Sequence, residues 1–420
     1  MHRAETNHQA DHWTTELRGW LDNTARQAGF TVAGIAPVRS DESPDSSRDA
    51  DRFAAWIDAG HAGEMDYLKR RDESGVLLRS SVATAFPWVR SIIVCALDYS
   101  SAAPRSVDPA PSSAGWIARY AWSGRTLDDG TTIPTDYHDD LLSRLRNIEN
   151  ALYERAHCDT RCYVDTGPLV ERALAVQAGI GWTGKNTCLI HQDRGSWLLL
   201  GVILTSLPLE DAGGPLAASG SGSDFISAIA ADRCGTCTRC IDACPTGALL
   251  GCSSPIAPRE MDASRCIAYL TIEKKADVPE ELRGPIGRNV FGCDICQDVC
   301  PWNVKAAKPV DKTPKQMRPR AELINPALEW LAQMDSREFR RRFRGSPLER
   351  TGRKRLLRNV AIAMGNSGDP SFIPQLQEWT AWPCEHANDV ALRDAAAWAL
   401  ERLSASPHLA ETLKITPEVP

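Results

Sequence analysis

CGTCTRCIDACP, from Cys234 to Pro245, spaces four cysteines as C-x2-C-x2-C-x3-C-P. A second run, CDICQDVCP, extends from Cys293 to Pro301 with the spacing C-x2-C-x3-C-P. Three thiolates at such short spacing bind three irons of one cubane, whereas the cysteine before the proline binds the other cluster. The two runs therefore predict a ferredoxin-like module with two 4Fe-4S clusters.

This spacing divides the cysteines into two ligand sets. The first set is Cys234, Cys237, Cys240 and Cys300. The second set contains Cys244, Cys293 and Cys296 and needs a fourth thiol from elsewhere. Cys266 in ASRCIAYL is the preferred fourth ligand, and Cys252 is the alternative. Zinc sites also use pairs of CxxC units, but the CP endings and the x2-x2-x3 spacing favour iron and sulfur.

The composition is that of a soluble, globular protein. The chain has 420 residues, of which 43% are hydrophobic and 24% charged, so two or three domains are expected. No apolar run reaches the ~18 residues that a membrane span needs, and the polar start MHRAETNHQADHW lacks the apolar core of a secretory signal. We expect a cytoplasmic protein without a membrane partner, in which fourteen cysteines bind metal more readily than they form disulfides.

The first two hundred residues alternate helical and strand-like patterns, which predicts a layered α/β domain. Helices are expected over 14–30, 137–156 and 168–179, with Pro168 in the first turn of the last one. Strands are expected over 31–38, 91–99, 161–165 and 196–205. Two stretches rich in Pro, Gly, Ser and Ala, 100–115 and 210–223, are expected to be surface insertions.

Three domains follow from these patterns. We expect an α/β domain over 12–231, the ferredoxin-like module over 232–303 and a helical domain over 322–405. In the last of these, LLRNVAIAM and VALRDAAAWAL align at a spacing of 35 residues. This pair predicts helical repeats of the HEAT kind, although the period is short for them.

The segment from 164 to 201 is the densest polar part of the first domain. Neither GxGxxG after a strand nor GxxxxGK[ST] is present, so no dinucleotide site or P-loop is indicated. Asp165 ends a predicted strand, where loops carry functional sites. Gly179, Gly181 and Gly184 allow the backbone to approach a bulky ligand closely.

A basic stretch, SREFRRRFRGSPLERTGRKRLLRN, carries ten basic residues against two acidic ones between Arg337 and Arg358, a local charge of +8 in a chain of net charge -6. Such clustering is typical of phosphate binding, and Phe339 and Phe343 could add apolar contacts. A solvated helix face with ion pairs is the alternative. The expected RNA contacts are Arg340, Arg341, Arg342, Arg344, Arg353, Lys354 and Arg355.

Several of these segments together resemble the epoxyqueuosine reductase family: DTGPLVERALAVQAGIGWTGKNT, RYAW, DYH, CPWN and LLRNVAIAMGN. The resemblance covers about 12–405. It implies a cobalamin-dependent enzyme that reduces epoxyqueuosine to queuosine at the wobble position of tRNA. It also implies base-off cobalamin in the α/β domain, the clusters close to the corrin, and a helical domain that grips the anticodon stem-loop. An external electron donor and a monomeric chain are expected.

The resemblance further implies site residues. Asp165 would donate a proton to the departing oxygen, for which burial would have to raise its pKa; capping a helix at Pro168 is the alternative role. Tyr67 and Tyr137 could cover the corrin or a nucleobase, or pack in the core. The cofactor contacts implied are Tyr67, Cys95, Asp165, Arg172, Lys185, Asn186, Leu189, His191 and Leu200. Judged from the residues alone, Cys95, Cys158, Cys162, Cys188 and Cys384 are expected to be small buried hydrophobes.

One segment departs from the family pattern. SGRTLDDGTTIPT, 123–135, separates RYAW from DYH, which are usually joined by a very short link. The insertion could reshape the mouth of the pocket, so the roles of Tyr120 and Tyr137 are open. The remaining alternatives are a cobalamin reductase of a small molecule, similar to the reductive dehalogenases, and an electron-transfer subunit without catalysis.

Overall fold

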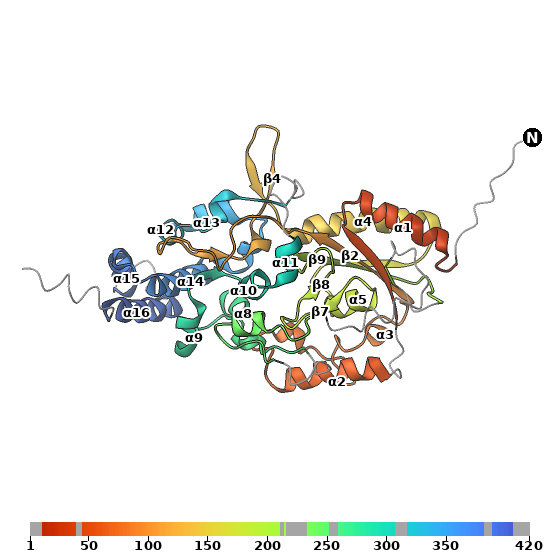
Figure 1. Ribbon diagram of the computed structural model, residues 1–420, viewed down its shortest axis with the longest axis horizontal. Helices are drawn as coiled ribbons and strands as arrows, with labels where there is room; N and C mark the ends of the chain where they lie inside the picture. Colours follow the sequence, from red (N-terminus) through yellow and green to blue (C-terminus); the bar gives the residue numbers. More distant parts are fainter. Residues whose placement is uncertain are drawn as a thin grey trace, which may run out of the picture.

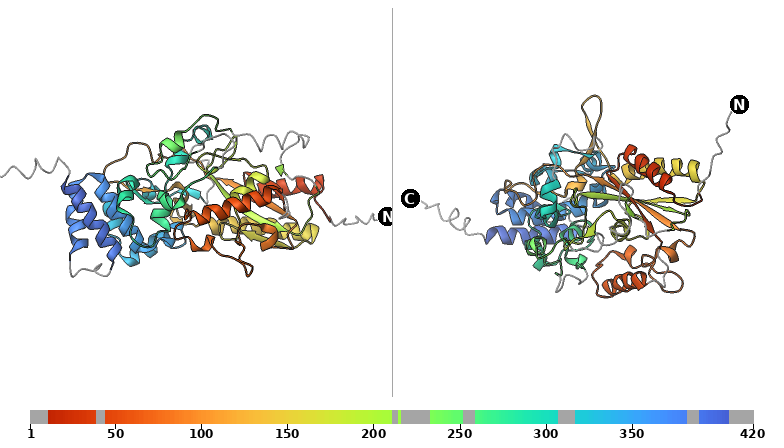
Figure 2. Two further views of the ribbon diagram at one scale, coloured as in Figure 1. Left: turned by 90° about the horizontal axis from the view of Figure 1, so that it is seen from below. Right: turned by 45° about the vertical axis from the view of Figure 1, so that its right-hand side comes forward.

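The computed structural model describes residues 11–38, 44–210, 214–215, 233–251, 259–306, 317–381 and 389–405. The molecule is elongated (Figure 1). A sheet with its covering helices forms one end, the C-terminal helices form the other, and the two cysteine runs lie between them. Figure 2 shows the same succession from two further sides. No helix in the described part of the chain is long and apolar enough to cross a membrane.

A five-stranded sheet organises the first end, in the order β10-β1-β2-β9-β6. Every adjacent pair is antiparallel. The layered arrangement agrees with the expected helices on a sheet, but the connections are not the crossovers of a parallel α/β sheet. The strands are β1 (Val32–Pro37), β2 (Ser91–Asp98), β6 (Thr160–Tyr163), β9 (Leu198–Thr205) and β10 (Gly214–Pro215).

The central strand β2 is buried along its whole length, because helices cover both faces of the sheet. Successive side chains of a strand point to opposite faces. Ile93, Cys95 and Leu97 thus join the core under α1 (Thr15–Gln27) and α4 (Tyr137–Ala156). The residues between them, Ile92, Val94 and Ala96, point to the other face and pack on the side of α5 (Glu171–Gln177).

The insertion at 123–135 forms a hairpin of β4 (Ser123–Thr126) and β5 (Thr132–Pro134). β12 (Arg318–Pro319) adds a third antiparallel strand beside β4. The hairpin projects from the body close to α13 (Ser336–Phe343) (Figure 1). It ends directly before Asp136, the N-cap of α4, whose side chain accepts a hydrogen bond from the backbone N–H of His138.

One hydrophobic core joins the central segments to the C-terminal helices. It runs from Met65 through Trp116 and Leu270 to Leu403. Long helices α14 (Gly352–Ser367) and α16 (Val390–Ser404) pack against each other, with α15 (Ile373–Thr380) beside them. Shorter elements complete this part: α2 (Pro44–Asp58), α3 (Val82–Ala85), β3 (Trp116–Ile117), β7 (Trp182–Thr183), β8 (Leu189–Ile190), α7 (Arg239–Asp242), α8 (Ile267–Ile272), α9 (Glu280–Ile286), β11 (Asn289–Phe291), α10 (Ile295–Asp298), α11 (Pro301–Ala306) and α12 (Leu328–Ala332).

Candidate active site and cluster sites

Asp165 lies in the loop that follows β6. Its backbone has φ +52, a left-handed conformation that aspartate accepts more readily than most residues. Its side chain is 63% exposed, so a ligand can reach the carboxylate. The expected helix from Pro168 begins only at Glu171, and its cap residue is Val170 without a side-chain cap bond. Asp165 therefore does not cap this helix.

Two side chains from the first turn of α4 meet Asp165. The hydroxyl of Tyr137 donates a hydrogen bond to Oδ2 of Asp165 at 3.2 Å. Nε2 of His138 lies 3.8 Å from the same oxygen. On its other side, Nδ1 of His138 lies 2.6 Å from Oδ1 of Asp136. A chain of interacting side chains thus leads from Asp136 through His138 to Asp165.

These contacts set the pKa values in this chain of groups. Burial pushes the pKa of Asp165 upward, but the nearby His138, the hydrogen bond from Tyr137 and the charge of Arg172 together outweigh it, so that the pKa lies below its ordinary value. This direction is opposite to the one expected for a proton donor. Burial likewise opposes protonation of His138, but the hydrogen bond to Asp136 and the nearby carboxylate of Asp165 raise the pKa of the imidazole above its ordinary value.

Glu171 is a second carboxyl group at this site, and sequence reasoning missed it. Burial, followed by a smaller repulsion from Asp165, raises its pKa to about 7. Its Oε1 is buried and has no hydrogen-bond partner among the described residues. No motif marks it, because a glutamate at the start of a helix is ordinarily solvated.

The loop between α5 and β8 connects this site to the cysteine runs. Arg172 donates to the backbone carbonyl of Thr187 at 2.7 Å. Nζ of Lys185 donates to the carbonyl of Gly235, also at 2.7 Å. Asn186 is buried and its Nδ2 lies 3.4 Å from the carbonyl of Cys296. Lys185 and Asn186 therefore each contact one of the two cysteine runs.

The other expected cofactor contacts are dispersed. Leu189 and Leu200 pack on the α5 side of the sheet. The Nδ1 atom of His191 accepts from the backbone of Asp193 at 3.0 Å. Cys95 has no exposed surface and points to the opposite side of the sheet, so its thiol meets no ligand. It packs as a small hydrophobe instead.

The two tyrosines considered for ligand contact are not simple core residues. Tyr67 is 48% exposed, and Arg79 lies over its ring. Burial, then the charges of Glu273 and Asp165, raises its pKa to about 12. Tyr137 stacks edge-on against Tyr120, with ring centroids 5.8 Å apart. Because its hydroxyl reaches Asp165, the insertion leaves this tyrosine in the site.

The first expected ligand set surrounds a cavity of about 220 Å³. All four cysteines of this set line the cavity, namely Cys234, Cys237, Cys240 and Cys300. Lys185, Asn186, Arg233 and Trp302 also line it. Burial raises the pKa of the Cys240 thiol to about 12, and the other three thiols add to this shift.

The second expected set also comes together. Burial raises the pKa of Cys293, and the thiols of Cys266 and Cys244 raise it further. The pKa of Cys296 is raised by its hydrogen bond with Cys188 and by burial, and the thiols of Cys293 and Cys266 raise it further. Cys266 therefore lies with this set, as preferred, whereas Cys252 and Cys384 are outside the described residues.

Cys188 was expected to be an isolated thiol, but it lies against the second set. A hydrogen bond with Cys296 lowers the pKa of Cys188 to about 7. In the sequence, Cys188 follows GKNT and has no second cysteine at CxxC spacing that would indicate a metal site. Only the folding of the loop 184–188 onto the second cysteine run brings the two thiols together.

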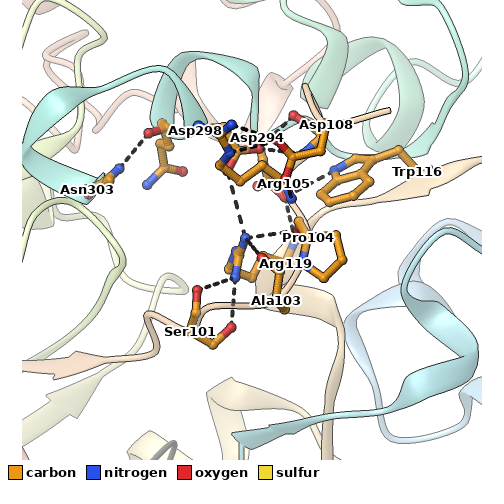
Figure 3. Close-up of polar contacts among 12 residues, drawn as sticks. Ser101, Ala103, Pro104, Arg105, Asp108, Trp116, Arg119, Asp294, Asp298 and Asn303 are labelled. Carbon is orange, nitrogen blue, oxygen red and sulfur yellow. Dashed lines mark hydrogen bonds and ion pairs between the residues drawn. The ribbon is translucent and has the colours of Figure 1, made fainter. Parts of the chain in front are cut away.

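A buried network anchors the second cysteine run to the RYAW segment (Figure 3). Asp294 accepts from the indole of Trp116 at 3.1 Å and from the backbone N–H of Arg119 at 2.7 Å. Asp298 lies 3.8 Å from the guanidinium of Arg119. The same guanidinium donates to backbone carbonyls of the 101–104 segment, among them that of Ser101 at 3.0 Å. Burial, then the charge of Asp298, raises the pKa of Asp294 to about 7.

The basic stretch divides into exposed and internally bonded side chains. Its exposed basic members are Arg337, Arg340, Arg341, Arg344, Arg350 and Lys354. Arg341 pairs with Glu338 at 2.6 Å, as does Arg342 at 2.8 Å. By contrast, Arg353 and Arg355 donate to the backbone carbonyls of Met334 and Ile272, so part of their hydrogen bonding serves the fold.

Two further residues of the stretch differ from expectation. Phe339 and Phe343 were expected to offer apolar contacts between the arginines. Both are buried in the core under α13, with 6% and 0% exposure, because they lie four residues apart on the inner face of the helix. The apolar anchoring therefore serves packing, and only charge remains on the outer face.

Two family models match the chain. A model described as a 4Fe-4S double cluster binding domain matches residues 233–303. A second, described as Epoxyqueuosine reductase QueG, DUF1730, matches residues 79–166. The first model agrees with iron and sulfur rather than zinc at the cysteine runs.

Curated relatives and solved structures match over most of the length. The epoxyqueuosine reductase of Xanthomonas campestris is 35% identical over 394 residues, covering 92% of this chain and 96% of the relative. That of Pseudomonas aeruginosa is 36% identical over 91% of this chain and 93% of its own. A crystal structure of epoxyqueuosine reductase with an epoxyqueuosine-modified tRNA stem loop has a TM-score of 0.73 at 29% identity, covering 96% of this chain and 95% of that one.

Proposed function

The chain belongs to the epoxyqueuosine reductase family, and we propose that Asp165, beside a bound cobalamin, carries its activity. The enzyme reduces epoxyqueuosine in tRNA to queuosine. Conversion of the epoxide to the alkene takes up two electrons and two protons and releases one water. The chain must therefore supply a route for electrons and at least one acid close to the departing oxygen.

Asp165 meets the requirements for the acid. Its carboxylate is open to a ligand, and Tyr137 and His138 hold it from one side. Among the neighbouring groups, His138 lowers its pKa most, and Tyr137 and Arg172 add to this effect. A bound ligand that covers the carboxylate and a neutral His138 would both favour the protonated acid. The contact between Asp165 and the DYH segment is the observation that carries this proposal.

The residues around Asp165 suit a ligand with many amide groups. The unpartnered Oε1 of Glu171 needs a hydrogen-bond donor, and the amide side chains of a corrin are such donors. Arg172, Leu189, Leu200 and Tyr67 would complete the walls of the site. When bound, cobalamin would supply a strongly reducing metal centre; the protein would hold it and direct the proton.

We assign the electron route to the two cysteine sets. Cluster one would be bound by Cys234, Cys237, Cys240 and Cys300. Cluster two would be bound by Cys244, Cys266, Cys293 and Cys296. The segment that carries Lys185 and Asn186 contacts both cysteine runs, and Arg172 of α5 donates to Thr187 in the same segment; electrons from an external donor would enter through the clusters.

For the tRNA we propose the outer face of α13 and the start of α14, with the HEAT-like helices α14 to α16 as support. Arg340, Arg341, Arg344 and Lys354 are exposed there. The domains would be 12–231, 232–303 and 322–405, in a cytoplasmic monomer. The wobble nucleotide would have to leave its stack to reach Asp165.

Replacing Asp165 tests this assignment. Asp165→Asn keeps the size and hydrogen bonds of the side chain but removes the acid. We expect turnover of epoxyqueuosine tRNA to fall by about 10²–10⁴-fold, with iron content and cobalamin binding unchanged. Asp58→Asn, at a 72% exposed surface position, is the control. An undiminished rate in the Asp165 variant would remove this residue from the mechanism.

A further inference from the structure

Arg350 makes an unusual contact with the chain of groups around Asp165. It ends the short 3-10 helix Pro347–Arg350, between α13 and α14. One guanidinium nitrogen lies 2.7 Å from Nε2 and 3.1 Å from Nδ1 of His138. These two residues are 212 positions apart in the sequence. A guanidinium and an imidazole, both positively charged when protonated, thus lie in contact at the site where the reaction needs an acid.

Such a contact decides which of the two groups is charged. Arginine stays protonated throughout the physiological range, whereas histidine titrates within it. A guanidinium at this distance opposes a second positive charge on the imidazole. It therefore favours neutral His138, against the pull of Asp136 and Asp165 on the other sides.

The charge of His138 in turn decides the state of Asp165. His138 is the main group that holds the pKa of Asp165 down. When the imidazole is neutral, this stabilisation of the carboxylate is lost, and Asp165 keeps its proton to higher pH. The groups that face His138 are Asp136 and Tyr137 from the start of its own helix, Asp165 from the loop after β6, and Arg350 from the C-terminal part.

We propose that Arg350 is a positioning residue that opposes protonation of His138 and so weakens the stabilisation of the Asp165 carboxylate by the imidazole. This inference rests on the proposed role of Asp165. It gives Arg350 a task different from that of the other exposed basic residues of the stretch. They would attract phosphate, whereas Arg350 acts on the acid through the imidazole.

The charge state of His138 can be measured without turnover. Diethyl pyrocarbonate modifies the neutral imidazole but not the protonated one, so the rate of its reaction at His138, followed by peptide mass spectrometry across pH, reports the pKa of this histidine. The measurement uses the cluster-containing protein without cobalamin. In Arg350→Gln we expect the pKa of His138 to rise by ~1 unit or more, whereas Arg350→Lys, which keeps the charge, should stay close to the wild type.

The pH dependence of turnover gives the second measurement. Single-turnover rates that need protonated Asp165 fall as pH rises through its pKa. In Arg350→Gln this fall should move to lower pH, with little change in KM for tRNA, and Arg350→Lys should restore it. Arg90→Gln, at an exposed side chain that donates to the backbone carbonyls of Pro87 and Val89, is the control.

The outcomes separate the two proposals. An unchanged pKa of His138 in Arg350→Gln would overturn the role of Arg350, whatever the activity. A raised pKa of His138 with an unmoved pH profile would also overturn it, because His138 would then not act on the acid. Full activity of Asp165→Asn would instead refute the role of Asp165 in the proposed function.

Discussion

Single residues at this site were predictable to different degrees. Asp165 stands at the end of a strand pattern and within a motif, and the structure brings it to Tyr137 and His138. The contact of His138 with Arg350 joins positions far apart in the sequence, which no local pattern encodes. Glu171 was missed because burial, not residue type, makes its carboxyl unusual.

Glu171 gives stability a defined pH dependence. Its pKa in the folded protein is about 7 against an ordinary 4.5. The contribution of this group to stability is therefore fully present below about pH 4.5 and is lost as pH rises through 7. In Glu171→Gln this loss disappears. We expect the variant to be more stable than the wild type at pH 8 by on the order of 3 kcal/mol, and much closer to it at pH 5.

Thermal unfolding of anaerobic, cobalamin-free protein at the two pH values would test this. Glu349→Gln, at an exposed glutamate, is a matched control whose difference in melting temperature from the wild type should be the same at pH 5 and pH 8. Equal melting temperatures of Glu171→Gln and wild type at pH 8 would show that the carboxyl is not held in its neutral form.

At the scale of elements, sequence patterns located the main helices and strands to within a few residues. They did not show that the sheet is antiparallel, because the pairing of β2 with β9 joins residues about a hundred positions apart. The pattern also placed the start of α5 three residues early, since Pro168 suits a first turn but belongs to the preceding loop. The insertion 123–135 had no predicted structure, and the structure shows a hairpin.

The anchoring of the second cysteine run depends on Arg119. Its guanidinium is buried near Asp298 and against backbone carbonyls. Removing one member of a buried ion pair leaves the other uncompensated, which costs about 3–5 kcal/mol. We expect Arg119→Met to lose stability of this order and to retain iron poorly.

Arg105→Met is the matched control, because Arg105 forms an exposed pair with Asp108 that contributes at most about 1 kcal/mol. Denaturant unfolding and iron analysis of both variants would compare them. If Arg119→Met were as stable and as rich in iron as the control, the network would not hold the cluster segment.

The exposed arginines on the outer face of α13 are predicted to bind the phosphates of the tRNA. Replacing Arg340, Arg341 and Arg344 by Gln removes three exposed charges. Each lost phosphate contact should reduce the slope of log affinity against log salt by about 1, so tRNA binding should weaken most at low salt. Electrophoretic or filter-binding titrations at several salt concentrations measure this.

Arg26→Gln with Arg155→Gln, on α1 and α4, is the control pair, since both side chains form surface ion pairs at the other end of the molecule. Unchanged affinity and salt slope in the α13 variant would place the RNA elsewhere.

At the scale of the whole molecule, the parts form one continuous structure. A single core links the segment around Trp116, the cysteine-rich module and the C-terminal helices, and Arg350 reaches from the C-terminal part to the acid. The sequence divided these regions by composition, but their contacts arise from long-range packing that local patterns do not report. We expect the anaerobically reconstituted protein to contain about eight irons per chain, as two cubanes require.

Iron, zinc and cobalt analysis of the reconstituted protein would check that number. Four irons would mean that one cysteine set does not bind a cluster, and zinc in place of iron would refute the cluster assignment. Cys266→Ala should lower the iron content, whereas Cys158→Ala, at a buried thiol away from both sets, should not.

The most direct test is conversion of the modified nucleoside itself. Cluster-loaded protein is incubated anaerobically with a reductant and epoxyqueuosine tRNA, with and without cobalamin, and nucleosides are measured by mass spectrometry. We predict that queuosine forms only with cobalamin and that epoxyqueuosine disappears in equal amount. Equal conversion without cobalamin, or none with it, would contradict a cobalamin-dependent reduction at Asp165.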